Sequence, residues 1–205
     1  MSPPANGQPR REAILSLLVP AGLVVDVGCD HGHIAAAIQA RGFAVVATER
    51  RRHRLPERAD VPRVVADGLE PFRTVDLAVI TGMGPHAILD ILARGPAPRV
   101  AIVHTPDRTD TLRQGLADAG WRIDAERLAP EGHRFAEVIR VVRGEEPHEG
   151  HALWFGPGLR DDPLLPRHAA SVRAHWTRVA ARAPEGSPGH ARAVGWLAFL
   201  DAEGL

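Results

Sequence analysis

Short apolar runs alternate with helix-length segments over most of this 205-residue chain. Such alternation predicts a parallel sheet covered by helices on both faces, because a crossover between parallel strands needs a dozen or more residues. We predict valine-rich strands at 23–27, 43–47, 63–66, 75–80 and 99–103. Helices are predicted at 10–18, 34–40, 50–58, 87–93 and 109–119. The first half of the chain therefore has the pattern of a doubly wound α/β fold.

Two further predicted strands, 121–128 and 134–142, follow each other without a helix between them. Their connection is too short for a parallel crossover, so this pair should be antiparallel. We therefore expect a Rossmann-like α/β fold with a mostly parallel seven-stranded sheet and an antiparallel last strand.

The composition changes after residue 144, where Gly, Pro, His and Glu become frequent. We predict a disordered start over 1–9, one main domain over 10–144, and a linker with a small helical C-terminal extension over 145–205. The extension should contain a helix, since apolar residues recur at spacings of four and three: Leu165, Ala169, Val172, Trp176 and Val179. The arginines on its other faces either form a solvated surface or contact phosphate: Arg167, Arg173, Arg178 and Arg182.

Charge and cysteine content exclude several classes of protein. The 25 arginines balance 25 acidic residues, so no global field attracts a polyanion, and contact with nucleic acid would need local patches. Cys29 is the single cysteine, which excludes an internal disulfide. With no long apolar run and no secretory pattern, we expect a cytoplasmic monomer or weak dimer away from membranes.

Ligands of such sheets bind at the carboxyl ends of the strands, and all five predicted parallel strands end in polar residues or glycine. Glu49 lies 21 residues after Gly28, the spacing of an acceptor for a ribose diol. Asp30 occupies the position where a dinucleotide loop needs glycine, and its charge would repel a pyrophosphate. The same charge favours a cationic cofactor such as S-adenosyl-L-methionine. Asp67 is the expected partner of the adenine amino group.

The candidate residues form three sets. The candidate cofactor-binding residues are Asp26, Gly28, Cys29, Asp30, His31, Gly32, Glu49, Arg50, Asp67, Gly68 and Gly82. The catalytic candidates are Asp30, Gly82, Met83 and Gly84, because two glycines after the fourth strand let the backbone approach a flat base. The candidate substrate residues are His104, Thr105, Pro106 and Asp107.

Other chemistries have weak support in the sequence. His31 and His33 form a His-x-His pair without further ligands at metal-binding spacing, so we expect no metal site. Cys29 has no activating partner and should be buried rather than nucleophilic. The chain contains neither a Gly-x-Ser-x-Gly motif nor a Walker loop.

Several motifs, in order from about residue 10 to 176, resemble those of the bacterial tRNA adenine-N1 methyltransferases that act on adenine 22. They are "VVDVGCDHG" (24–32), "DGL" (67–69), "ITGMG" (80–84), "TPD" (105–107), "LRQGLADAGWRIDAERLAPEGHRFAEVIRV" (112–141), "FGPGL" (155–159) and "PLL" (163–165). The resemblance implies a class I methyltransferase fold, S-adenosyl-L-methionine as cofactor and tRNA as partner. It carries the cofactor role to Asp26, Gly28, Asp30, His31, Glu49, Asp67 and Gly82.

The chain departs from that family at positions that border the target base. His33 replaces an aromatic residue, Pro85 replaces a glycine, and Thr105-Pro106-Asp107 replaces Gln-Pro-Asn. Two alternatives therefore stay open: a methyltransferase for a small molecule or protein, and a protein that binds the cofactor or RNA without catalysis.

Overall fold

A computed structural model describes residues 7–54, 61–132 and 134–205. The first six residues of the predicted disordered start, and residues 55–58 of the predicted helix 50–58, lie outside this range. Helix α1 (Gln8–Ser16) begins two residues earlier than predicted. Pro9 fits there because proline is tolerated in the first turn of a helix, where its missing N–H is not needed.

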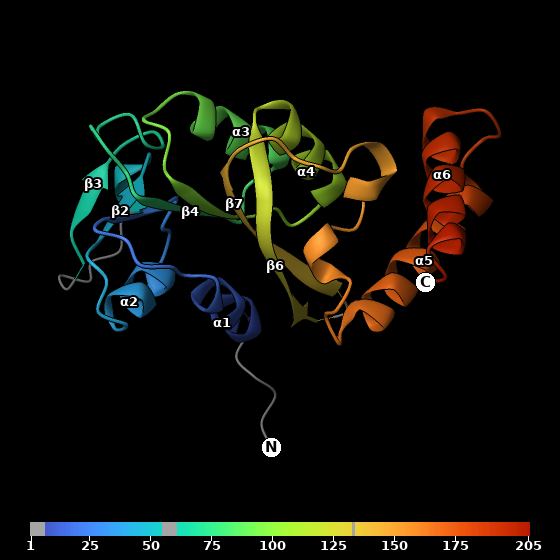
Figure 1. The fold of residues 1–205 in the computed structure, drawn as a ribbon, viewed down its shortest axis with the longest axis horizontal. Helices are drawn as coiled ribbons and strands as arrows, with labels where there is room; N and C mark the ends of the chain where they lie inside the picture. Colours follow the sequence, from blue (N-terminus) through green and yellow to red (C-terminus); the bar gives the residue numbers. More distant parts are fainter. Residues whose placement is uncertain (1–6, 55–60, 133) are drawn as a thin grey trace, which may run out of the picture.

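Seven strands form one sheet in the order β3-β2-β1-β4-β5-β7-β6 (Figure 1). Strands β1 to β5 are parallel to one another, and β7 runs antiparallel to both of its neighbours, β5 and β6. The strands are β1 (Val24–Val27), β2 (Val45–Glu49), β3 (Arg63–Val65), β4 (Leu77–Thr81), β5 (Val100–His104), β6 (Trp121–Glu131) and β7 (Arg134–Arg143). The predicted α/β architecture is thus confirmed.

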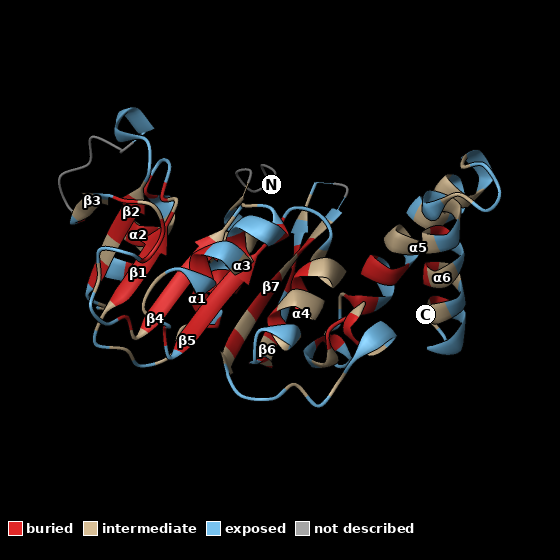
Figure 2. Cartoon of the chain, turned by 90° about the horizontal axis from the view of Figure 1, so that it is seen from above, coloured by how far each residue is buried: buried red, intermediate tan, exposed pale blue. Residues whose placement is uncertain are grey.

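Alternate residues of the central strands pack into two different cores, one on each face of the sheet. Val24 and Leu77 join the core under α1 and α2 (His33–Gln39). Their neighbours Val25 and Ala78 join the core under α3 (Pro85–Ala93) and α4 (Thr109–Asp118). Burial on both faces explains why these strands are mostly apolar, and Figure 2 shows the central strands as a largely buried part of the molecule.

The predicted helix at 50–58 is wrong in its described part. Residues 52–54 form only a 3₁₀ turn, η1 (Arg52–Arg54), all of it exposed. The segment has no apolar stripe to bury, and its adjacent positive charges repel one another.

The C-terminal extension contains two short turns, η2 (Gly150–Leu153) and η3 (Pro157–Leu159), and two helices. The predicted helix is confirmed as α5 (Leu165–Arg182), and α6 (Pro188–Ala202) packs against it. Leu165, Trp196 and Leu200 contribute to a third, separate core. This pair of helices lies beside β6 and β7, at the opposite end of the sheet from β2 and β3 (Figure 1).

Buried charges join the extension to the sheet. The side chain of Arg113 in α4 donates to Glu126 on β6 through Nε at 2.9 Å and Nη2 at 2.7 Å. Nη2 also lies 2.7 Å from Oε2 of Glu137 on β7, without the alignment of a hydrogen bond. Oε1 of Glu137 is 3.0 Å from Nε2 of His168 on α5, and Nη1 of Arg113 donates to the Trp154 carbonyl at 3.2 Å. The extension is therefore bound at Trp154 and at His168 to a charged cluster inside the protein.

Candidate functional site

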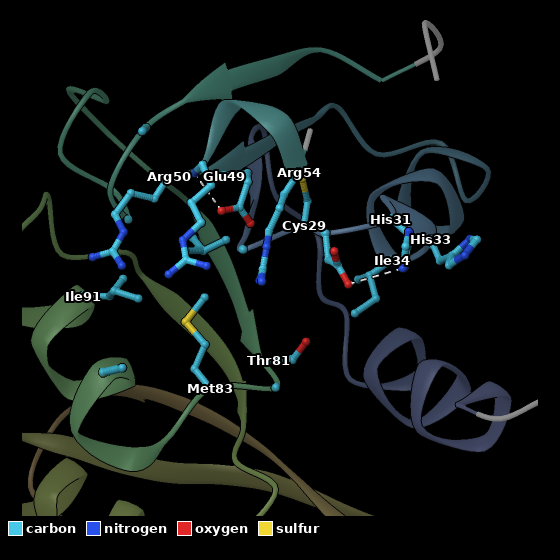
Figure 3. A pocket seen from close by; sticks show the side chains of 18 of the residues that line it. Cys29, His31, His33, Ile34, Glu49, Arg50, Arg54, Thr81, Met83 and Ile91 are labelled. Atoms are coloured by element: carbon cyan, nitrogen blue, oxygen red, sulfur yellow. Dashed lines mark hydrogen bonds and ion pairs between the residues drawn. The ribbon is translucent and has the colours of Figure 1, made fainter. Parts of the chain in front are cut away.

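A cavity of about 780 Å³ opens at the carboxyl ends of β1, β2 and β4 (Figure 3). Its size lies within the range of small-molecule sites. The first loop, the end of β2, the start of the loop after β4 and the helix α1 all contribute to its wall. The cavity therefore lies where a doubly wound sheet is expected to bind its ligand.

The first loop, residues 28–32, turns through three positive φ angles. Gly28 has φ 73°, Asp30 has φ 41° and Gly32 has φ 70°. The Gly28 and Cys29 amides donate to the Thr48 carbonyl at 2.8 and 3.0 Å, which ties the loop to β2. A Cβ on Gly28 would lie 2.2 Å from Cε of Met83, so the flexible end of that side chain would have to move, but the backbone angle is the stricter reason for a glycine here.

Asp30 adopts a left-handed conformation that few residues other than glycine, asparagine and aspartate tolerate. Its side chain is 62 % exposed and lies 3.6 Å from His31 Nε2. Both residues line the cavity, and their role in binding a positively charged ligand stays a prediction. Because Asp30 carries its charge at an accessible turn, the loop offers an anion where a dinucleotide loop would offer bare backbone.

Glu49 ends β2 and points into the same cavity (Figure 3). Its Oε1 accepts a hydrogen bond from the Arg51 amide at 2.9 Å, which holds the carboxylate in place. This arrangement fits the predicted role as acceptor for a ribose hydroxyl, which stays a prediction.

Asp67 lines the cavity and lies between two arginines. Its Oδ2 is 3.5 Å from Arg94 Nη1 and 4.0 Å from Arg50 Nη1. Arg94 also contacts Glu70 and Asp90, so it orients several carboxylates at once. Sequence reasoning missed Arg94, which caps the C-terminus of α3 and belongs to no recognisable motif.

Two of the predicted cofactor residues are buried polar groups. Asp26 does not line the cavity; its Oδ2 accepts from the Ala35 amide at 3.0 Å and so fixes the start of α2. Burial raises the pKa of Asp26 to about 7. Burial, together with the charges of Asp26 and Glu49, raises the pKa of the Cys29 thiol to about 11. Cys29 is therefore protonated at neutral pH, which agrees with the interpretation that it is no nucleophile.

The remaining predicted residues divide between the cavity and its surroundings. Gly68, Gly82, Met83 and Pro106 line the cavity, as does Thr81, which was not among the predicted residues. Of the described predicted residues, those outside its lining are Asp26, Gly32, Gly84, His104, Thr105 and Asp107. His104 and Thr105 are buried at the end of β5, and burial with the nearby charge of Arg10 lowers the pKa of His104 to about 4.

Helix α1 adds residues that sequence reasoning did not assign to the site: Gly7, Arg10, Arg11 and Ile14. Its amphipathic pattern predicted a helix but gave no indication that this helix covers the carboxyl edge of the sheet. Within the described residues, no group of three or more His, Cys, Asp or Glu side chains could hold a metal ion.

Comparisons with known proteins identify relatives of this fold. Among solved structures, M. capricolum TrmK in complex with S-adenosyl-homocysteine is 15 % identical, with a TM-score of 0.79 over 95 % of this chain and 96 % of that one. The B. subtilis M1A22 tRNA methyltransferase TrmK is 16 % identical, with a TM-score of 0.71 over 94 % and 96 %. Streptococcus pneumoniae Sp1610 with S-adenosyl-L-methionine is 24 % identical, with a TM-score of 0.72 over 94 % and 97 %. These likenesses establish the fold.

A curated relative and a family description add sequence evidence. A tRNA dimethylallyltransferase of Anaeromyxobacter sp. (strain Fw109-5) is 28 % identical over an alignment of 172 residues that covers 73 % of this chain. The chain spans about half, 55 %, of that relative's length. Residues 24–182, well over half of the chain, match the family described as tRNA (adenine(22)-N(1))-methyltransferase. The chain therefore belongs to the tRNA (adenine(22)-N(1))-methyltransferase family.

Proposed function

We propose that this protein transfers a methyl group from S-adenosyl-L-methionine to N1 of an adenine in tRNA, at a position of the adenine-22 type. The observation that carries the proposal is the family match over 24–182 around a cavity whose first turn holds Asp30. The family description and the name of the curated relative both refer to tRNA, which supports a tRNA acceptor.

The residues present fit such a cofactor. Carboxylates lie at the ends of β1, β2 and β3, and none of the three strand ends offers the glycine-only turn that a pyrophosphate needs. We assign Asp30 to the charged methionine end, Glu49 to the ribose and Asp67 to the adenine amino group. When bound, S-adenosyl-L-methionine supplies a methyl group on a positively charged sulfur.

The chain's own contribution to the reaction is positioning and electrostatics. Adenine N1 has a free lone pair at neutral pH, so no side chain has to remove a proton before the attack. The lone pair forms the new N–C bond as the S–C bond breaks and its electrons return to sulfur. The base then carries the positive charge, which Asp30 and the other carboxylates of the cavity stabilise.

N1 lies on the Watson–Crick edge, so the target adenine has to leave its base pair before it can react. We assign the wall formed by Gly82, Met83 and Pro106 to the flat face of the base, since these residues line the cavity beside the first loop. Among the described residues no helix is long and apolar enough to cross a membrane. The cytoplasm, as monomer or weak dimer, is our expected setting for this reaction.

The experiment is transfer of labelled methyl groups from S-adenosyl-L-methionine to three acceptor pools: unmodified bulk tRNA, proteins and small metabolites. We expect transfer to tRNA only, together with calorimetric binding of the cofactor. Transfer to one of the other pools but not to tRNA would establish the alternative methyltransferase. Cofactor binding with no transfer to any pool would identify a binding protein instead.

A further inference from the structure

Arginines are concentrated at the cofactor cavity. Six of its described lining residues are arginines, although the net charge of the chain is zero: Arg10, Arg11, Arg50, Arg51, Arg54 and Arg94. They come from three places: α1, the segment from the end of β2 to η1, and the C-terminal end of α3, which Arg94 caps. This local concentration is the kind of patch that a neutral protein needs to bind a polyanion.

Three of these arginines are already neutralised within the protein. Arg10 pairs with Glu131, Arg50 lies 4.0 Å from Asp67, and Arg94 contacts three carboxylates. The other three, Arg11, Arg51 and Arg54, have no ion pair with any residue in the described ranges. The proposed cofactor has one carboxylate and two positive charges, so it does not account for three further cations.

The competing basic surface is the arginine-rich helix α5. There Arg173 is 2.7 Å from Asp201 and donates to the Leu205 carbonyl at 2.5 Å. Arg178 donates to the Ala174 carbonyl at 3.1 Å, and Arg167 lies over the Phe135 ring at 5.7 Å. The guanidiniums of Arg173 and Arg178 contact the extension itself, and that of Arg167 lies over β7. Helix α5 packs beside β7, far along the sheet from β2.

We propose that Arg11, Arg51 and Arg54 form a phosphate clamp that holds the tRNA backbone on either side of the target adenine. The proposal rests on the proposed function. A base that enters the cavity from a polynucleotide brings its flanking phosphates to the cavity mouth. Arg11 on α1 and Arg51 with Arg54 after β2 line that same cavity from two elements, so they offer cations to both flanks.

The clamp has a specific thermodynamic signature. Each phosphate neutralised by an arginine releases condensed counterions, so affinity falls as salt rises, with a slope of about −0.7 per contact on a single strand. Loss of all three contacts should therefore reduce the magnitude of the slope of log K against log salt by about 2.

The test compares two variants that each lose three positive charges. The clamp variant combines Arg11→Gln, Arg51→Gln and Arg54→Gln. The control combines Arg167→Gln, Arg178→Gln and Arg182→Gln on α5. For each, we would measure the Kd for unmodified tRNA at several salt concentrations, the Kd for S-adenosyl-L-methionine by calorimetry, and the KM for tRNA. Thermal unfolding checks that both variants fold.

We expect the clamp variant to lose about tenfold or more in tRNA affinity and to show the smaller salt slope, with cofactor affinity within about twofold of the parent. The control should bind tRNA like the parent. Equal tRNA affinity and slope in the clamp variant and the parent would overturn the clamp. So would a larger loss in the control, which would place the RNA on α5. A parent protein that methylates no tRNA would instead refute the proposed function, and the clamp with it.

Discussion

The most informative single perturbation of the fold is Arg113→Met. Arg113 is fully buried and forms ion pairs at 2.7 Å with both Glu126 and Glu137, whose side chains are 0 % and 11 % exposed. Methionine would fill much of the same volume but leave two carboxylates inside the protein, with the His168 imidazole beside Glu137 and the Gly158 amide beside Glu126 as remaining partners. Removal of one member of a buried charge cluster costs about 3–5 kcal/mol, because the remaining charge is uncompensated.

The pH dependence follows from Glu137. Burial alone would raise the pKa of its carboxyl group, but the charge of Arg113 and the contact with His168 lower it to about 2, from 4.5. The unfolded chain therefore takes up a proton at higher pH than the native state does. The lowered pKa of Glu137 therefore contributes about 3 kcal/mol to the stability of the native state. This contribution is complete above about pH 5 and is lost as the pH falls from 4.5 towards 2. In Arg113→Met the buried carboxylates prefer their protonated form, so the difference in free energy of unfolding between the parent and the variant should become smaller at acidic pH.

Urea unfolding at pH 7 and pH 4 measures both effects. At pH 7 we expect a loss of about 3–5 kcal/mol, equivalent to about 6–20 °C in Tm for a chain of this size. The matched control is Arg122→Met, since Arg122 is 43 % exposed and only 4.0 Å from Asp124, and it should cost less than about 1 kcal/mol. The triple variant Arg113→Met, Glu126→Gln, Glu137→Gln should recover part of the loss. A loss below about 1 kcal/mol for Arg113→Met, or the same loss at both pH values, would refute this reasoning.

Three further substitutions test the site and the junction. Gly28→Ala forces a side chain onto a φ of 73° and places a methyl group 2.2 Å from Met83. Cofactor affinity, measured by calorimetry, should fall by about tenfold or more. The double variant Gly28→Ala, Met83→Ala should recover part of that affinity. Asp30→Asn keeps the left-handed turn but removes the charge of residue 30, so cofactor affinity should fall while Tm stays nearly unchanged. If the variant binds the cofactor as tightly as the parent protein, the charge of Asp30 does not contribute to binding. Gly156→Ala brings a methyl group within 1.8 Å of the Glu126 carboxylate, so the free energy of unfolding in urea should fall by about 1–3 kcal/mol. An unchanged free energy of unfolding would mean that the loop at Gly156 moves aside.

The sheet could be predicted because its central strands are buried on both faces. Val24 to Val27 lie between two helical layers, so their sequence is apolar except for the buried Asp26 and is bounded by loop residues. The hairpin of β6 and β7 was harder to interpret. Glu126 and Glu137 look like ordinary outward-facing positions of a strand, but the extension covers them, and only the folded chain shows that Arg113 neutralises both.

The candidate site was predictable to the extent that topology determines it. Parallel strands bring their carboxyl ends to one edge, so Asp30, Glu49 and Asp67 had to be neighbours. Arg94 and the arginines of α1 could not be assigned in this way, because their position depends on how helices pack over the edge. Asp26 shows the converse: a carboxylate on β1, just before the first loop, is buried and fixes the start of α2 rather than lining the cavity.

The central claim is tested most directly by the position of the methyl group. Unmodified tRNA with adenine at position 22 is incubated with the protein and S-adenosyl-L-methionine and then copied by reverse transcriptase, which N1-methyladenine blocks. We predict a new stop at the nucleotide after position 22, absent without cofactor and absent from the same tRNA carrying guanine at that position. Full-length copies from the adenine-22 tRNA, under conditions in which calorimetry shows the cofactor bound, would contradict the account.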